Sequence, residues 1–307
     1  LHLSDNLIFL EDYATIDEAV ENAYAGFRLE SDIENLTSED TFYTKDEFRS
    51  FIKDSRNMGV NIIPEFDMPA HALAITRAFP NLMTKEAGGN HRYLIEELDI
   101  RKDGALDAAK SVWAQYFEGD DPVFDKDTTV HIGTDEFHGN GGNEYFRSFS
   151  DSMIKYIQGT GRDVRMWGSL SNKNGKTPVA SKDVQLNISN TGYANPKNMY
   201  DLGYDLINTL EGSLYIVPSA GYYSDYLNSQ NLYNNWVPNN FSGTVLRAGD
   251  KQVLGGTYAI WNDQIGTRGN GITEYDDFDR FFQPLPSLSE KMWGEGTDRT
   301  YSEMRAV

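Results

Sequence analysis

The stretch Val130-His131-Ile132-Gly133-Thr134-Asp135-Glu136 indicates best how this chain folds. It begins as a strand of β-branched and apolar residues and ends in two adjacent carboxylates. Because successive side chains of a strand point to opposite faces, His131, Gly133 and Asp135 share one face. Glu136 belongs to the other face unless it already lies on the outgoing loop. Gly133 lets another group approach the backbone closely.

Asp135 and Glu136 repel each other as charged neighbours, and a structure that buries both pushes their pKa values apart. Such a pair supplies one acid and one base from a single residue type. The alternative is a solvated Asp-Glu pair at the start of a loop, which is the usual interpretation of an isolated pair of this kind.

Composition limits the classes of function. The chain has 307 residues, 39% of them apolar, and a formal charge of −20. This charge argues against nucleic acid, whose binding depends on neutralising phosphates. We expect no membrane span, since no apolar run approaches about 18 residues. The absence of cysteine excludes disulfides and thiolate metal sites. Many aromatic residues in a polar, glycine-rich chain suit sugar binding.

Helical and strand patterns alternate along the chain. Thr44 and Glu47 form a capping box that opens one helix, and further helices are expected at 16–24, 106–117, 145–158, 199–202 and 276–282. Strands are expected near residues 1, 62, 131, 165, 186, 207 and 257. This alternation predicts a parallel sheet with right-handed crossovers. Trp113 and Trp293 lie on helical stretches and are expected in the core.

Several expected strands end in polar or aromatic residues, including Asp5, Asp67 and Trp167. Function at the carboxyl ends of many strands is typical of a (β/α)8 TIM barrel, whereas a doubly wound sheet usually has a glycine-rich phosphate loop. We therefore predict an α/β fold with a single catalytic barrel domain over residues 1–307. Its first strand is expected to precede residue 1 and to be lacking here.

The chain resembles glycoside hydrolase family 20, the β-N-acetylhexosaminidases and lacto-N-biosidases. His131–Glu136 is similar to that family's H-x-G-x-D-E segment. Residues 64–71, Pro-Glu-Phe-Asp-Met-Pro-Ala-His, are similar to its P-E-I-D-x-P-G-H segment, with Ala70 in place of glycine. Residues 2–6, His-Leu-Ser-Asp-Asn, resemble its H-L-x-D-D segment, with Asn6 for the second aspartate. The three motifs occur in order, at the spacing of barrel strands.

The resemblance implies substrate-assisted catalysis, in which the substrate's 2-acetamido oxygen attacks the anomeric carbon. Glu136 is then the general acid and base, with a pKa raised towards neutrality. Asp135 is expected to stay ionised, to accept the acetamido N–H and to stabilise developing positive charge. Tyr226, in a Tyr-Leu-Asn segment similar to the family's Tyr-Leu-Asp, is expected to hold the acetamido oxygen, with Tyr222 and Tyr223 as rivals.

The resemblance also implies the substrate-binding residues. Trp167 and Trp261 match aromatic walls of the sugar pocket, and Tyr193 is expected as a third wall. Asp5 lies in the first motif. His71 is expected beside Asp135, and His131 as a buried hydrogen-bonding residue. No cofactor and no metal are expected, and the partner is an oligosaccharide or glycan that contains N-acetylhexosamine.

The last strand gives the expected specificity. Exo-acting hexosaminidases typically carry Trp-Gly-Glu there, and this chain has Trp261-Asn262-Asp263. The shorter Asp263 leaves space beyond the sugar ring, as in the lacto-N-biosidase branch. We therefore expect release of lacto-N-biose (Galβ1,3GlcNAc) from non-reducing ends, with exo-β-N-acetylhexosaminidase activity as the alternative.

Two other classes remain. A metallohydrolase barrel would use the histidines and aspartates, but such barrels usually carry a His-x-His pair on an early strand, and this chain has none. A non-catalytic sugar-binding module would retain the pocket without turnover, against which Asp135, Glu136 and Tyr226 argue. The resemblance implies a secreted or cell-surface protein.

Overall fold

The computed structural model describes residues 1–6, 12–87, 92–139, 142–264, 271–294 and 299–306, without the side chains of residues 5 and 6. The chain divides into two compact units, Leu1–Val184 and Gln185–Val307, and each is described by itself. The prediction of one catalytic domain over residues 1–307 stays a prediction.

The first unit contains the helices α1 (Ile16–Asn22), α2 (Lys45–Asn57), α3 (Leu73–Ala78), α4 (Ala105–Phe117) and α5 (Asn143–Gly159), with a 3₁₀ turn at Pro80–Leu82. The predicted capping box of α2 is present: Thr44 Oγ1 accepts from Glu47 N, and the Glu47 carboxylate accepts from Thr44 N. The long helices α2, α4 and α5 therefore begin within two residues of their predicted starts, whereas α3 was not predicted.

Four segments of the first unit lie side by side in parallel. His2 bridges to Glu65, and Glu65 bridges to His131. His131 ends strand β3 (Val130–His131), which pairs with β4 (Val164–Trp167). Strand β1 (Ser4–Asn6) pairs antiparallel with β2 (Ala25–Phe27), an addition that was not predicted. The carboxyl ends of the parallel segments carry Asp67, Asp135 and Trp167 to one edge.

A cluster of aromatic side chains packs against the segment that bears Phe66. Phe66 lies between Glu65 and Asp67 in the sequence. Its ring centroid is 4.5 Å from that of Trp113 and 5.2 Å from that of Tyr116. All three residues are completely buried. Burying a side chain of this size stabilises the fold by about 1.5–3 kcal/mol, so these contacts stabilise the segment that carries Glu65 and Asp67. The prediction that Trp113 lies in the core is confirmed.

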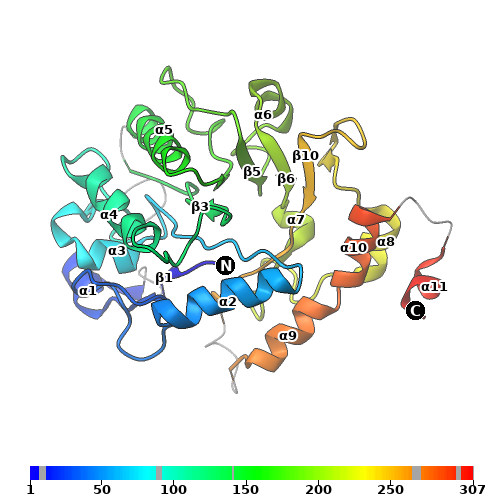
Figure 1. The fold of residues 1–307 in the computed structure, drawn as a ribbon, viewed down its shortest axis with the longest axis horizontal. Helices are drawn as coiled ribbons and strands as arrows, with labels where there is room; N and C mark the ends of the chain where they lie inside the picture. Colours follow the sequence, from blue (N-terminus) through cyan, green and yellow to red (C-terminus); the bar gives the residue numbers. More distant parts are fainter. Residues whose placement is uncertain (7–11, 88–91, 140–141, 265–270, 295–298, 307) are drawn as a thin grey trace. The chain divides into compact units, whose positions relative to one another are not determined.

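The second unit contains a three-stranded parallel arrangement in the order β10 (Val253–Gly256), β6 (Asp205–Asn208) and β5 (Val184–Ile188) (Figure 1). Strand β7 (Tyr215–Ile216) pairs in parallel with β11 (Ala259–Ile260), and β8 (Asn240–Phe241) pairs antiparallel with β9 (Thr244–Val245). The helices are α6 (Pro196–Leu202), α7 (Glu211–Leu214), α8 (Ser229–Asn235), α9 (Glu274–Phe282), α10 (Leu285–Trp293) and α11 (Tyr301–Arg305).

Trp293 corrects one prediction. It ends α10, and 86% of its surface is exposed, so it does not lie in the core. The buried face of α10 is formed by Leu288, which packs with Leu232 and Trp236. The helical pattern located the helix but did not distinguish its last residue, which projects beyond the packed face.

The predicted α/β class with parallel strands is confirmed. Closure of an eight-stranded barrel, and the lack of its first strand, stay predictions. Among the described residues, none of the helices combines the length and the apolar character that crossing a bilayer requires.

Candidate active site

The backbone after β3 leaves the strand conformation at once. Gly133, Thr134 and Glu136 have φ values of +71°, +80° and +42°, and His71, on the neighbouring segment, has +51°. Left-handed conformations of residues other than glycine cost about 1–3 kcal/mol each and gather at functional sites. Glu136 therefore lies on the outgoing loop, the second of the two placements considered from the sequence.

Gly133 permits a close approach by Asp67. A Cβ atom at position 133 would lie 1.7 Å from Asp67 Oδ1 and 2.5 Å from Asp67 Cα. Only a glycine fits there, as the sequence pattern predicted. The approach allows Thr134 N to donate to Asp67 Oδ1 over 3.0 Å, while Asp67 N donates to Ser4 Oγ. Asp67 is thus fixed by two neighbouring segments and is 2% exposed.

Asp67 and Asp135 form a carboxyl pair. Burial, and then the charge of Asp67, raise the pKa of Asp135 well above its usual value. Two adjacent carboxyl groups in a buried site oppose each other's ionisation, because like charges repel strongly there. The expectation that Asp135 is ionised during catalysis stays a prediction.

Glu136 has a different environment. Its side chain is 45% exposed, and its Oε2 lies 3.3 Å from His71 Nε2. Burial alone would lower the pKa of His71, but the hydrogen bond to Glu136 and the charges of Asp135 and Asp67 raise it well above the usual value. His71 is therefore the ion-pair partner of Glu136, and it also lies beside Asp135, as the sequence interpretation predicted, with side-chain donor atoms of the two residues within 4.8 Å of each other.

Glu65, His131 and Trp167 form a second, buried group. Glu65 Oε1 is 3.2 Å from His131 Nδ1 and accepts from Trp167 Nε1 over 2.7 Å. Burial opposes ionisation of Glu65, but His131, and then His2, lower its pKa below the usual value. His131 is buried, as predicted. Trp167, predicted as a wall of the sugar pocket, is 5% exposed and anchored through its indole N–H; its contact with substrate stays a prediction.

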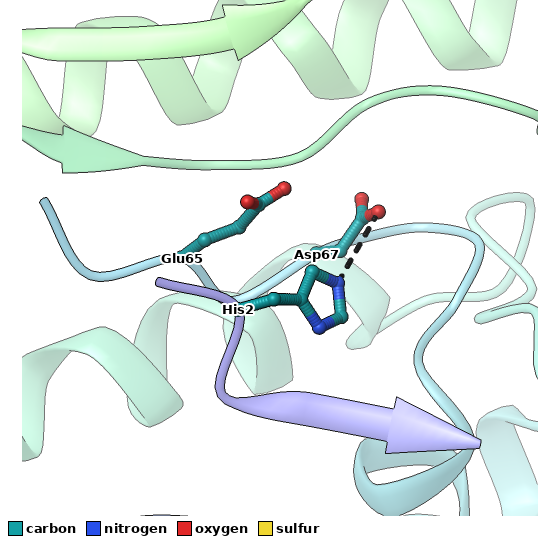
Figure 2. Close-up of side chains that lie close together, drawn as sticks. All are labelled: His2, Glu65 and Asp67. Carbon is teal, nitrogen blue, oxygen red and sulfur yellow. Dashed lines mark ion pairs between the residues drawn. The ribbon is translucent and has the colours of Figure 1, made fainter. Parts of the chain in front are cut away.

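His2 approaches this group from the neighbouring segment. Figure 2 shows His2, Glu65 and Asp67 together, with the ion pair between His2 Nε2 and Asp67 Oδ2 at 3.8 Å. Within the described residues, two groups have donor atoms within 4.8 Å of one another and could hold a cation: His2–Glu65–Asp67 and Asp67–His71–Asp135.

The remaining predicted residues, apart from Asp5, belong to the second unit. The Trp261 ring is 5.7 Å from Tyr215 in an edge-to-face arrangement, and Trp261 N donates to Ile216 O. Asp263 is exposed and accepts from Tyr222 OH over 3.2 Å. Tyr215 thus lies against Trp261, and sequence reasoning missed it.

Tyr226 has different neighbours. Its hydroxyl donates to Asp279 Oδ2 on α9 over 3.0 Å, and the guanidinium of Arg280 lies 4.3 Å from its ring centroid. Tyr193 is half-buried in a turn after β5. The backbone of Asp5 belongs to β1, and its side chain lies outside the described residues. The substrate roles of these three residues stay predictions.

Two acidic residues near the site were also missed. Glu97 is completely buried, and its Oε1 accepts from His138 N over 2.6 Å. Burial raises the pKa of the adjacent Glu96 to about 7, with the charges of His71 and His138 opposing the shift. The signal was present in the sequence, because two carboxylates inside the apolar run 93–98 indicate buried acids.

Comparison with known proteins gives this arrangement a family. The lacto-N-biosidase of Bifidobacterium bifidum is 27% identical over 297 residues, covering 87% of this chain and 25% of that protein. A β-hexosaminidase of Emericella nidulans is 22% identical, covering 83% and 50%. The chain thus spans between a quarter and a half of these two relatives.

Solved structures show the same fold. A β-N-acetylhexosaminidase from Bacteroides fragilis superposes with a TM-score of 0.67 at 21% identity, covering 92% of this chain and 59% of that one. The exo-β-N-acetylglucosaminidase from Vibrio harveyi, solved with N-acetylglucosamine, gives 0.68 at 19% identity, covering 92% and 50%. The family profile described as "Glycosyl hydrolase family 20, catalytic domain" matches residues 2–295. The chain therefore belongs to glycosyl hydrolase family 20.

Proposed function

We propose that this domain hydrolyses β-linked N-acetylhexosaminides with retention of configuration, using the substrate's 2-acetamido oxygen as the nucleophile. The observation that carries the proposal is the contrast between two adjacent carboxyls. Asp135 is half-buried, and burial and the charge of Asp67 raise its pKa, whereas Glu136 is exposed and paired with His71. Different environments give one residue type two roles.

A mechanism with two independent carboxylates fits this site poorly. Such enzymes place one carboxyl on each side of the sugar, about 5–5.5 Å or 6.5–9.5 Å apart. Asp135 and Glu136 are consecutive residues, and consecutive residues cannot readily straddle a sugar ring. A nucleophile supplied by the substrate removes the need for the second position.

The His71–Glu136 pair supplies the proton for the leaving oxygen. In the free protein the raised pKa of His71 favours the ion pair. A bound sugar excludes water from the pair, and a pair of charges is less stable in a drier environment. The proton then moves from His71 Nε2 to Glu136 Oε2, 3.3 Å away. Protonated Glu136 acts as the general acid, and its carboxylate later activates water as the general base.

The Asp67–Asp135 pair stabilises the intermediate. Negative charge on this pair lies in a largely buried position, where electrostatic interactions are stronger than in water. As the acetamido group attacks, its nitrogen becomes positive, and an Asp135 oxygen accepts the N–H. Asp67 keeps the pair from moving, because Thr134 N and Ser4 Oγ hold it. Preorganised charge of this kind is often a large contribution to catalysis.

A tyrosine that binds the acetamido oxygen completes the proposed machinery. Tyr226 is the residue that the sequence motif predicts. Tyr215 is favoured by its contact with Trp261, because the Tyr226 hydroxyl already donates to Asp279. We therefore propose Tyr215 for this role, with Tyr226 as the alternative.

For the substrate, we propose glycans that carry lacto-N-biose at a non-reducing end. Asp263, which follows Trp261, is exposed and has a shorter side chain than glutamate. This supports the proposal that a second sugar fits beside it. The similarity to the Bifidobacterium lacto-N-biosidase over 87% of this chain supports the same reaction. Such a substrate also suits a secreted or cell-surface enzyme.

Exo-β-N-acetylhexosaminidase activity is the second candidate, supported by the similarity to the Emericella β-hexosaminidase. Hydrolysis of the p-nitrophenyl glycosides of GlcNAc and of lacto-N-biose separates the two. We expect the lacto-N-bioside to have the higher kcat/KM, and cleavage of the GlcNAc glycoside alone would refute lacto-N-biose release. Glu136→Gln is the control. Hydrolysis of neither, with retained sugar binding, would identify a non-catalytic module, and loss of activity on exhaustive chelation would identify a metalloenzyme.

A further inference from the structure

Four aromatic rings form a row in the second unit. Trp261 lies 5.7 Å from Tyr215, Tyr215 lies 5.4 Å from Tyr223, and Tyr223 lies 5.5 Å from Tyr222, measured between ring centroids. The interplanar angles are 65°, 70° and 75°, so every contact is edge-to-face. Edge-to-face contacts between aromatic rings stabilise the arrangement of the rings beyond the effect of burial. The row therefore fixes the loop that bears Tyr222 relative to Trp261.

The last ring of the row, Tyr222, is hydrogen-bonded to the segment that carries the first ring, Trp261. Tyr222 OH donates to Asp263 Oδ2 over 3.2 Å, and Asp263 follows Trp261 by two residues. Tyr222 is 57% exposed, and Asp263 is exposed as well. An exposed carboxylate without a fixed donor changes rotamer freely. The hydrogen bond from a loop held by three ring contacts limits that freedom.

The tyrosine hydroxyl is suited to this role at neutral pH. Partial burial and the charge of Asp263 raise the pKa of Tyr222 above its usual value. The hydroxyl therefore stays protonated and donates. Tyr226, four residues later on the same loop, donates instead to Asp279. Of these two loop tyrosines, Tyr222 is thus the one bonded to Asp263.

We propose that Tyr222 is a positioning residue that orients the Asp263 carboxylate towards the hydroxyls of a second sugar. The proposal rests on the proposed function and adds the residue that sets the preference for a disaccharide over a monosaccharide. An ionised carboxylate accepts about four hydrogen bonds, so Asp263 accepts from Tyr222 and from a pair of sugar hydroxyls together. The exposed ring of Tyr222 offers an apolar surface to the CH face of that sugar.

Tyr222→Phe tests the proposal, because it keeps the ring and removes the donor. Tyr222 OH donates to a charged and exposed acceptor, and a hydrogen bond of this kind is worth about a tenfold change in an equilibrium constant. We expect the ratio of kcat/KM for the lacto-N-bioside to that for the GlcNAc glycoside to fall about tenfold, mainly through KM of the disaccharide substrate. Tyr275→Phe, at a tyrosine of α9 that is 77% exposed, is the matched control and should leave the ratio unchanged.

A double-mutant cycle identifies the route of the effect. Asp263→Asn should lower the same ratio, and Tyr222→Phe added to it should lower the ratio little further. Fully additive effects, or an unchanged ratio in Tyr222→Phe, would overturn the proposal.

The inference and the proposed function fail in different ways. If the unaltered protein hydrolyses neither glycoside, the proposed function is refuted, and calorimetric titration with free Galβ1,3GlcNAc and free GlcNAc then decides the role of Tyr222. Tighter binding of the disaccharide that is lost in Tyr222→Phe supports it. No preference for the disaccharide, or a preference that the variant retains, overturns it.

Discussion

Gly133→Ala tests the contact on which the site geometry depends. Residue 133 has a φ of +71°, and a Cβ there would lie 1.7 Å from Asp67 Oδ1. The left-handed conformation costs alanine about 1–2 kcal/mol. Displacing Asp67 breaks its hydrogen bond from Thr134 N, a further loss of about 1.5–3 kcal/mol for a charged acceptor. The expected loss in the free energy of unfolding is therefore about 2.5–5 kcal/mol.

Gly59→Ala provides the matched control. Gly59 has a φ of +84°, and nothing lies within 4 Å of a Cβ placed there. This variant carries the backbone cost alone, about 1–2 kcal/mol. Urea unfolding and kcat/KM should be measured for both variants. Equal destabilisation by the two alanines, with activity retained in Gly133→Ala, would refute the close approach of Asp67 and the orientation argued from it.

Other predictions concern the reacting groups. Asp135→Asn and Glu136→Gln should each lower kcat by about 10²–10⁴-fold, and near-normal turnover of either variant would contradict its role. His71, whose pKa is raised on folding, stabilises the folded state fully below about pH 6.5, and this contribution is lost as the pH rises through the raised value; His71→Gln should remove that alkaline loss from stability-pH curves, and an unchanged curve would count against the ion pair. Tyr215→Phe should lower kcat more than Tyr226→Phe, and the reverse order would restore the motif-based choice.

Local sequence signals predicted much of the fold. The capping box at Thr44 places the start of α2, because the two reciprocal hydrogen bonds need only residues 44 and 47. The parallel strands β3, β4, β5 and β6 follow apolar runs after helices and turns. Strand β1 pairs with β2 across residues 7–24, a segment that includes the helix expected at 16–24, so the pairing could not be inferred from neighbouring strand patterns.

The site was predicted in its residue types and less well in its pairings. Asp135 and Glu136 were identified from their adjacency at the end of a strand together with the resemblance of His131–Glu136 to the family segment. Glu136 reaches His71 because the backbone at Thr134 and Glu136 is left-handed. An argument that assumes strand conformation there gives the Glu136 side chain the wrong direction. The role of Asp67 depends on the close approach of its side chain to Gly133, which lies on another segment of the chain. Tyr215 escaped notice because its contact with Trp261 arises from the pairing of β7 with β11, far apart in sequence.

The comparison of p-nitrophenyl N-acetyl-β-glucosaminide with p-nitrophenyl β-glucoside tests the central claim most directly, with the corresponding pair of disaccharide glycosides run in parallel. Each pair differs only at carbon 2 of the reacting sugar, where one glycoside bears an acetamido group and the other a hydroxyl. If the substrate supplies the attacking oxygen, hydrolysis requires the acetamido group and the hydroxyl glycosides remain uncleaved. Efficient cleavage of a glycoside with a bare hydroxyl at carbon 2 would contradict the account, because the nucleophile would then have to come from the protein or from water.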